Sequence, residues 1–186
     1  IYLAPIIADF AREYPGISFD FDLTPRVVDL VSEPYDVAIR MGKPPDSNLI
    51  ARQLALLPCY LYASPVYIKR FGAPKHPSEL VNHECIGFRS SRGPVWTLHN
   101  QSESLDVSIK GRFQLNSIGM IRRFVLLDMG IAVLPTEIVS EEVSSGKLQR
   151  ILPNWEGQST PVYAMTETRL LPAKTQRFIE FLQKHL

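Results

Sequence analysis

The chain has 186 residues, of which 45% are hydrophobic and 21% charged, and its formal net charge is +1. These values are ordinary for a globular protein, and the length suits one domain or two small lobes. The sequence has no basic run, which argues against this segment binding nucleic acid by itself. No apolar run approaches the roughly 20 residues that span a bilayer.

The first part of the chain alternates between helical and extended patterns. Ile1–Glu13 has apolar residues at helical spacing and is predicted as a helix, which the turn Tyr14-Pro15-Gly16 follows. Ile17–Leu23 alternates apolar and polar residues, which is typical of a strand with one buried face. Arg26–Glu33 is predicted as a short helix and Tyr35–Arg40 as an apolar strand.

The middle of the chain contains a clear helix signal between several apolar runs. Ser64 followed by Pro65 combines an N-cap with a proline at the first helical position, and Gly72 is expected to end this helix. The apolar runs between polar turns are predicted as strands. These strands are Leu49–Leu54, Cys59–Ala63, Cys85–Phe88, Trp96–Leu98 and Val107–Leu115, with loops at Gly42–Ser47 and Arg89–Pro94 and a short helical turn at Pro77–Val81.

Arg112–Pro135 is the most informative stretch, because it combines a strand end, a capped helix and a second strand. Asn116 and Ser117 can cap a helix that runs to Met129, and Gly130 is expected to end it in a left-handed conformation. Two apolar stripes lie on roughly opposite sides of this helix: Ile118, Ile121, Val125 and Met129 on one side, and Met120, Phe124 and Leu127 on the other. One stripe can cover a sheet, so the other needs a second surface. The stretch therefore predicts a ligand site at the helix N-terminus and a subunit interface.

The last part of the chain continues the alternation. After the strand Ile131–Leu134, a helix is predicted from Thr136 to Ser145, with Gly146 as its stop. The remaining predicted elements are the strand Lys147–Leu152, the loop Pro153–Pro161, the strand Val162–Met165 and the helix Pro172–Leu186. Alternating strands and helices predict an α/β fold with mostly parallel sheets.

The sequence lacks the motifs of common enzyme and metal sites. It contains no GxGxxG or Walker phosphate loop, no HExxH motif and no GxSxG nucleophile elbow. His83 and Cys85 are the candidate metal ligands and Asp36 the candidate base, but a structural role is favoured for each. We therefore predict no enzyme activity, no metal and no cofactor. Cys59 and Cys85 lie in apolar surroundings and are predicted to be buried, reduced thiols, which fits a cytoplasm.

A series of short motifs runs nearly from end to end of the chain. The motifs are Leu3-Ala4-Pro5 to Phe10 with Tyr14-Pro15-Gly16; Tyr35-Asp36-Val37-Ala38-Ile39-Arg40-Met41-Gly42; Asp46-Ser47-Asn48-Leu49; Tyr62-Ala63-Ser64-Pro65-Val66-Tyr67; Pro77-Ser78-Glu79-Leu80 with His83-Glu84-Cys85-Ile86; Gly130-Ile131-Ala132-Val133-Leu134-Pro135; Gly146-Lys147-Leu148; and Leu171-Pro172-Ala173-Lys174. Each motif is unspecific alone. Their order and spacing together resemble the C-terminal effector-binding domain of LysR-type transcriptional regulators.

The resemblance implies two Rossmann-like lobes joined by two crossover strands, like a type II periplasmic solute-binding protein. Lobe I is predicted from residues 1–62 and 163–186, and lobe II from residues 63–162. The resemblance further implies a bacterial, cytoplasmic regulatory domain that senses a small-molecule effector. A winged helix-turn-helix DNA-binding domain would lie upstream, outside this chain.

The chain begins at Ile1 with no signal peptide, so we expect it to be a fragment of a longer protein. Family members carry a strand and a short loop before the position of Ile1. Part of the lobe I sheet and of the effector site is therefore expected to be missing from this chain.

We expect the effector cleft at strand ends and helix N-termini, where backbone amides converge. Arg40 and Arg89 could pair with the carboxylate of a metabolite, and the alternative for either arginine is a solvated side chain or a structural salt bridge. The predicted cleft residues are Arg40, Met41, Gly42, Ala63, Ser64, Phe88, Arg89, Asn116, Ser117 and Pro135.

The resemblance also supplies a partner for the second stripe of the central helix. In an antiparallel homodimer, Met120, Phe124 and Leu127 of one subunit would meet Leu3 and Ile7 in the first helix of the other. The alternative is that both stripes are buried within one lobe. The full-length protein could form a tetramer, and it would contact DNA only through the missing domain and no membrane. The alternative function is a solute-binding protein of a transporter, which the upstream sequence would discriminate.

Overall fold

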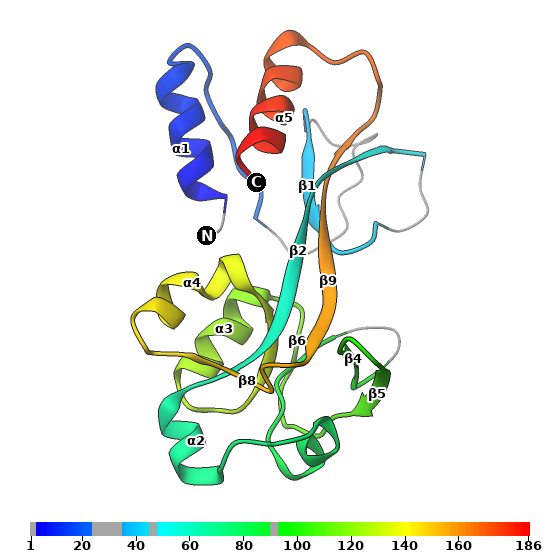
Figure 1. Cartoon of the computed structure of the whole chain (residues 1–186). Helices are drawn as coiled ribbons and strands as arrows, with labels where there is room; N and C mark the ends of the chain where they lie inside the picture. Colours follow the sequence, from blue (N-terminus) through cyan, green and yellow to red (C-terminus); the bar gives the residue numbers. More distant parts are fainter. Residues whose placement is uncertain (1–2, 24–34, 45–47, 90–92) are drawn as a thin grey trace. The chain divides into compact units, whose positions relative to one another are not determined.

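The computed structural model describes residues 3–23, 35–44, 48–89 and 93–186. The chain divides into two compact units: unit 1 consists of Ile1–Leu57 and Thr160–Leu186, and unit 2 consists of Pro58–Ser159. Two strands carry the chain from one unit to the other, β2 (Ile50–Ala63) and β9 (Glu156–Thr166) (Figure 1). The two boundaries between the units, Leu57–Pro58 and Ser159–Thr160, fall within β2 and β9, and each lies a few residues from a predicted lobe boundary.

A seven-stranded sheet runs in the order β5–β4–β9–β2–β7, with β1 paired to β9 and β8 paired to β2. Its other strands are β1 (Ala38–Met41), β4 (Val95–His99), β5 (Ser104–Ser108), β7 (Ala132–Pro135) and β8 (Gln149–Ile151). Each pairing with a described register in this sheet is antiparallel. A second sheet pairs β3 (Gly87–Phe88) with β6 (Gln114–Leu115) in parallel. The prediction of mostly parallel sheets is therefore wrong, because an alternation of helices and strands does not fix the direction of the strands.

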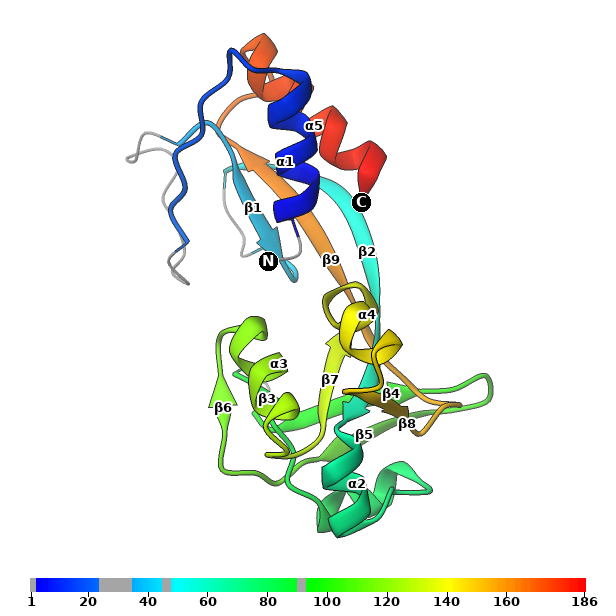
Figure 2. The ribbon, with the colours of Figure 1, turned by 90° about the vertical axis from the view of Figure 1, so that its left-hand side faces the viewer.

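Unit 1 has its own apolar core. Its helices α1 (Ala4–Glu13) and α5 (Ala173–His185) lie side by side (Figures 1 and 2). Phe10 of α1 is fully buried, and its ring centroid lies 5.2 Å from those of Phe178 and Phe181 in α5. Buried side chains of β2, β9 and α5 complete the cluster. The last helix therefore packs with the first part of the chain, as the sequence predicts.

The predicted strand Ile17–Leu23 is not formed in the structure. Phe19 does point inward, with its ring centroid 6.1 Å from that of Phe10 and 5.8 Å from that of Phe178. Phe21 and Leu23 are exposed. Alternation identifies the inward side chain, but a strand also needs a neighbouring backbone to pair with. The predicted helix Arg26–Glu33 falls mostly within residues 24–34, outside the described residues.

The helices of unit 2 are α2 (Pro65–Phe71), the short 3₁₀ helix η1 (Pro77–Asn82), α3 (Ile118–Leu126) and α4 (Thr136–Ser144). Two of these helices begin at the predicted capping serines, and α2 also ends at the predicted Gly72. The Ser64 Oγ accepts a hydrogen bond of 3.0 Å from the Tyr67 amide, and the Ser117 Oγ accepts one of 3.4 Å from the Met120 amide. These contacts confirm both serines as N-caps.

The end of α3 corrects one prediction. Asp128, with a φ of 63°, is the left-handed residue after this helix. Gly130 has another role, because a Cβ at this position would lie 2.4 Å from the carbonyl oxygen of Glu84. The amide of the next residue, Ile131, donates to the same oxygen over 2.9 Å. Glycine is therefore required here for the close approach of two backbones.

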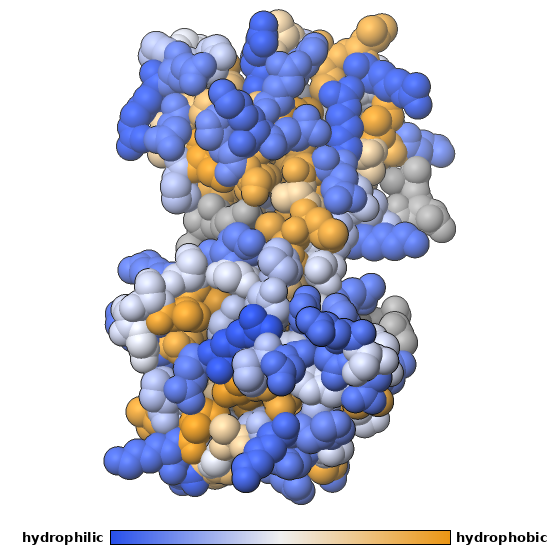
Figure 3. Space-filling view, viewed as in Figure 1, coloured by the Kyte–Doolittle hydropathy of each residue, from blue (hydrophilic) through white to orange (hydrophobic). Residues whose placement is uncertain are grey.

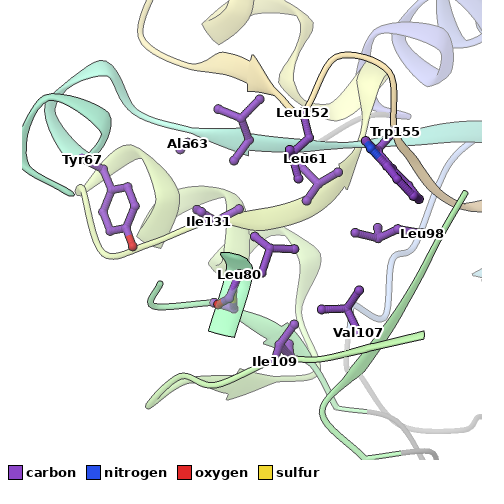
Figure 4. Close-up of a cluster of buried hydrophobic side chains, with 12 residues drawn as sticks. Leu61, Ala63, Tyr67, Leu80, Leu98, Val107, Ile109, Ile131, Leu152 and Trp155 are labelled. Carbon is purple, nitrogen blue, oxygen red and sulfur yellow. The ribbon is translucent and has the colours of Figure 1, made fainter. Parts of the chain in front are cut away.

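The larger core cluster of unit 2 lies beneath β2 (Figure 4). Side chains from β2, α2, η1, β4 and β5 converge on it. Its labelled members are Leu61, Ala63, Tyr67, Leu80, Leu98, Val107, Ile109, Ile131, Leu152 and Trp155. A second cluster joins α3, α4 and β7 through Ile121, Val125, Leu134 and Val139.

Three predicted strand boundaries are wrong. Leu49–Leu54 and Cys59–Ala63 belong to one continuous strand, β2, although Pro58 lies between them. The predicted strand Val107–Leu115 is broken near Gly111, where a Cβ would lie 1.9 Å from the Cys85 carbonyl oxygen. The predicted loop Pro153–Pro161 contains the first half of β9.

Candidate functional site

Three strands of unit 2 end at the same edge. β3 and β6 are parallel, with Phe88 opposite Leu115, and a parallel bridge joins Cys85 to Ile131 just before β7. The ends of β3, β6 and β7 therefore face the same way, and Figure 2 shows β6 and β7 running in the same direction. The carboxyl ends of parallel strands are the usual ligand site in an α/β sheet.

Two helices begin at this edge. α3 starts directly after β6, with Asn116 and Ser117 at the junction, and α4 starts directly after Pro135. The first amides of a helix have no partner within it, and they carry partial positive charge. Ser117 accepts from one of these amides in α3, whereas no side chain caps α4. The remaining amides can donate to a polar or anionic ligand.

Phe88 and Arg89 complete the edge. The Arg89 amide donates to the Leu115 carbonyl over 2.7 Å, which fixes the backbone that follows β3. The side chains of both residues are exposed. An aromatic ring and a guanidinium beside helix N-termini suit a carboxylate with an apolar body. The structure thus brings Phe88, Arg89, Asn116, Ser117 and Pro135 together.

Arg40, Met41 and Gly42 lie in unit 1, at the end of β1. Arg40 is paired in register with Tyr163 of β9. The Gly42 amide donates to the Pro161 carbonyl over 2.8 Å, and the φ of 88° at Gly42 favours glycine. All three residues are half-buried. Their membership of the effector site stays a prediction.

Ala63 and Ser64 do not belong with the edge residues of unit 2. β2 is antiparallel to β7, so Tyr62 lies opposite Ala132 at the start of β7 while Cys59 lies opposite Pro135 at its end. Ala63 and Ser64 therefore lie at the other end of the sheet from Pro135. The Ser64 Oγ also has two partners already, because it donates to Asp128 Oδ1 over 2.5 Å and accepts from Tyr67. The prediction included them because Ala63 ends a predicted strand and Ser64 begins a helix, and neither signal gives the direction of β2.

Thr136 is an edge residue that the prediction missed. It is the first residue of α4, and its Oγ1 lies 3.3 Å from the Tyr62 hydroxyl and 3.5 Å from the Pro58 carbonyl oxygen. These contacts tie the start of α4 to β2. A hydroxyl residue directly after the strand-ending Pro135 was a usable signal, since such residues favour helix N-termini.

The candidate metal ligands have structural contacts. His83 Nδ1 lies 3.3 Å from the Tyr67 hydroxyl, and the Cys85 thiol contacts the Leu80 carbonyl oxygen at 3.7 Å. Burial raises the pKa of the Cys85 thiol to about 12. Cys59 and Cys85 are both buried and neither forms a disulfide. Across residues 3–23, 35–44, 48–89 and 93–186, no group of three or more His, Cys, Asp and Glu side chains could hold a metal ion.

The predicted dimer residues differ in exposure. Met120 and Leu127 in and after α3 are 48% and 50% exposed, whereas Phe124 packs on Phe113 with ring centroids 4.7 Å apart. Figure 3 shows apolar surface over the α3–α4 side of unit 2. Leu3 and Ile7 of unit 1 are half-buried. The described helices include none long and apolar enough to cross a membrane.

Known proteins resemble the chain over its whole length. The family model for the LysR substrate binding domain matches residues 1–186. The HTH-type transcriptional regulator DmlR of Escherichia coli (strain K12) is 35% identical over 186 residues, which cover 98% of this chain and 60% of that protein. PtxR of Pseudomonas aeruginosa, also an HTH-type transcriptional regulator, is 32% identical over 187 residues, which cover 100% of this chain and 60% of that protein.

Solved structures agree with these relatives. The regulatory domain of CrgA, a LysR-type transcriptional regulator from Neisseria meningitidis, superposes with a TM-score of 0.87 at 27% identity, covering 99% of this chain and 91% of that chain. Full-length AphB, the Vibrio cholerae virulence activator, gives a TM-score of 0.81 at 28% identity, and the match covers 98% of this chain and 63% of the AphB chain. The chain spans 60% of the length of DmlR and PtxR. The chain belongs to the LysR substrate binding domain family and has the periplasmic-binding-protein-like α/β fold of LysR-type regulatory domains.

Proposed function

We propose that this chain is the ligand-sensing regulatory domain of a bacterial, cytoplasmic LysR-type transcriptional regulator. The observation that carries the proposal is the end-to-end match to transcriptional regulators, in a domain where three strand ends and two helix N-termini share one edge. The chain would sense a small molecule and pass the signal to an upstream DNA-binding domain. DNA would be contacted only through that domain.

The names of the relatives support a regulator over the alternatives. DmlR and PtxR are both named as HTH-type transcriptional regulators, and CrgA is described as a LysR-type transcriptional regulator. These names support a regulatory domain, and they favour neither an enzyme nor the solute-binding protein of a transporter. A winged helix-turn-helix in the preceding sequence would agree with the proposal, and a signal peptide there would contradict it.

The proposed effector is a small carboxylate metabolite. Its carboxylate would bind at the edge of unit 2, to Arg89 and to the first amides of α3 and α4, with Asn116, Ser117 and Thr136 as polar neighbours. Phe88 would cover its apolar part, and Arg40, Met41 and Gly42 stay predicted effector-binding residues of unit 1. Arg89 and Phe88 are both exposed and can reach a ligand.

A thermal-shift screen of carboxylate metabolites tests this site. A ligand that binds only the folded state raises the Tm, by an amount that grows with its concentration. We expect Arg89→Gln and Asn116→Ala to weaken the binding of the best ligand by about tenfold, which corresponds to about 1.4 kcal/mol. If both variants bind as the wild type does, the edge is not the effector site.

Ser64→Ala is the matched control for these variants. Its hydroxyl caps α2 and donates to Asp128, at the far end of β2. Loss of an N-cap costs about 0.5–2 kcal/mol of stability. We expect Ser64→Ala to lower the Tm of the free protein and to leave ligand affinity unchanged, the opposite of Asn116→Ala.

We further propose that the domain forms a homodimer through α3. Met120 and Leu127 offer about half of their surface to solvent, next to the exposed Arg123. Leu3 and Ile7 of the partner's first helix are the proposed contacts, and each contact would occur twice in a twofold dimer. The full-length protein would assemble into dimers or tetramers.

A further inference from the structure

A cavity lies within unit 2, away from the edge just described. It has a volume of about 570 Å³ and lies between the start of α2 and the ends of α3 and α4. The edge of β3, β6 and β7 lies at the starts of α3 and α4, and the cavity lies at their ends. Each helix has nine residues, so about 13 Å of helix separates the cavity from that edge. The volume lies within the range of small-molecule sites. We call this cavity the α2–α4 groove.

Charges of both signs line the α2–α4 groove. Arg122, Arg123 and Lys147 supply cations, and Asp128 and Glu142 supply carboxylates. Arg122 and Glu142 form an ion pair, with side chains 19% and 7% exposed. Within the described residues, no ion pair joins Arg123, Lys147 or Asp128 to an opposite charge. Two cations and one carboxylate thus remain for a ligand.

The Arg122–Glu142 ion pair leaves polar atoms without partners at the groove. Glu142 is 6% exposed, and one of its carboxylate oxygens, Oε2, is buried without a hydrogen-bond partner. The Nε of Arg122 is in the same condition. Buried polar atoms without partners are rare in native proteins, and these two belong to one ion pair, so each other, a water molecule or a ligand atom can satisfy them.

The Asp128 carboxylate is held in place at the groove. Its Oδ1 accepts the Ser64 hydroxyl over 2.5 Å, and the left-handed backbone at Asp128 directs the chain out of α3. Ser64 is itself fixed as the N-cap of α2. The carboxylate is therefore preorganised, which lowers the cost of binding a cation beside it.

We propose that the α2–α4 groove binds a small zwitterion of the α-amino acid class. The ligand carboxylate would lie between Arg123 and Lys147, and its ammonium group beside Asp128, towards Glu142. Leu126 and the exposed side chain of Val66 offer an apolar wall for the ligand side chain.

The charge balance selects a zwitterion over simpler ions. A plain anion would meet the Asp128 carboxylate and the carbonyl ends of α3 and α4, which carry partial negative charge. A plain cation would meet Arg123 and Lys147. A zwitterion matches both groups at once, and it is a different chemistry from the plain carboxylate proposed for the effector edge.

The test is an NMR titration of the ¹⁵N-labelled chain with each of the twenty standard L-amino acids at about 10 mM, which detects binding with a millimolar Kd. We expect at least one to shift the amides at the start of α2 and the ends of α3 and α4. Its deaminated and decarboxylated analogues, such as isocaproate and isoamylamine for L-leucine, should bind at least about fivefold more weakly. Binding of the deaminated acid with equal affinity, or shifts confined to the edge of β3, β6 and β7, would overturn the proposal.

Two charge-removing variants complete the test. Asp128→Asn keeps a residue that tolerates the left-handed backbone and keeps an acceptor for Ser64, so it removes only the charge. Lys147→Gln removes one of the two cations proposed to bind the ligand carboxylate. Lys184→Gln in unit 1 is the control, because it removes a lysine far from the groove in sequence and in another unit. We expect the first two variants to weaken binding at least about fivefold and the control to match the wild type. If no amino acid shifts the amide resonances of the groove, or if both variants bind as the wild type does, the proposal fails. Arg123 and Lys147 then only stabilise the C-terminal ends of the helices.

Discussion

Gly111 lies so close to the backbone of Cys85 that no side chain fits between them. A Cβ at Gly111 would lie 1.9 Å from the Cys85 carbonyl oxygen, whereas a Cβ at Gly16 would meet nothing within 4 Å. We expect Gly111→Ala to lower the free energy of unfolding by about 1–3 kcal/mol or more, because backbone and not a flexible side chain must move. Gly16→Ala, the control, should stay close to the wild type in urea denaturation. Equal midpoints for both variants would show that the strand break at Gly111 has another cause.

His83 makes stability depend on pH. Burial lowers the pKa of His83 below its ordinary value of 6.5, and nearby Glu79 opposes this only in part. The unfolded chain then binds more protons than the native chain between the lowered pKa and 6.5. Stability is therefore full above pH 6.5 and falls as the pH drops through the lowered pKa. We expect the Tm of His83→Gln to fall less than that of the wild type between neutral and mildly acidic pH. Parallel Tm profiles for the two proteins would contradict this.

The sequence predicts the role of a residue when that role depends on its neighbours in the chain. It does not predict roles that depend on contacts with distant segments. Ser64 and Ser117 are N-caps because the side chain bonds to an amide three residues away. The sequence predicts Gly130 as a helix stop. Glycine is needed at this position for another reason, because a Cβ would collide with the backbone of Glu84, which is far away in the sequence. The edge residues Phe88, Asn116 and Pro135 could be predicted from strand ends. Ser64 could not be placed, because its position depends on the direction of β2.

At the scale of elements, helices followed the sequence more closely than strands did. α2 and α4 end within one residue of their predicted ends, because helix patterns and caps are local. Ile17–Leu23 has the alternation of a strand and forms none. β2 passes through Pro58 as one strand, although the sequence predicts two strands there and proline has no amide proton to donate. Strand formation depends on a partner that the segment itself does not reveal.

Two residues of the same apolar stripe of α3, Phe124 and Leu127, should respond differently to a charge. Leu127 is half exposed, whereas Phe124 packs on Phe113 in the core of unit 2. We expect Leu127→Asp to give a folded monomer by light scattering, because a charge there opposes an apolar dimer contact. Phe124→Asp should instead lower the Tm strongly. A Leu127→Asp protein that stays dimeric would place the interface elsewhere.

The whole molecule consists of two units with separate cores. Unit 1 is held by a cluster of α1, α5, β1 and the first half of β2, and unit 2 by the clusters around β2 and α3. The chain passes between them at Pro58 and next to Pro161, and neither proline can donate a ladder hydrogen bond. The family resemblance predicts the two-lobe organisation, but not the antiparallel pairing of β2 with β7 and of β9 with β1.

Separate cores predict separate local unfolding. Ile179 of α5 is 1% exposed and belongs to the cluster of unit 1, so Ile179→Ala should cost about 2–5 kcal/mol there. Native-state hydrogen exchange should show the amides of α1 and α5 losing protection, while those of α3 and β7 keep theirs. Leu134→Ala in β7 is the reciprocal control, with the loss expected in unit 2. If either variant lowers protection equally in both units, the two units unfold as one cooperative body and this prediction is wrong.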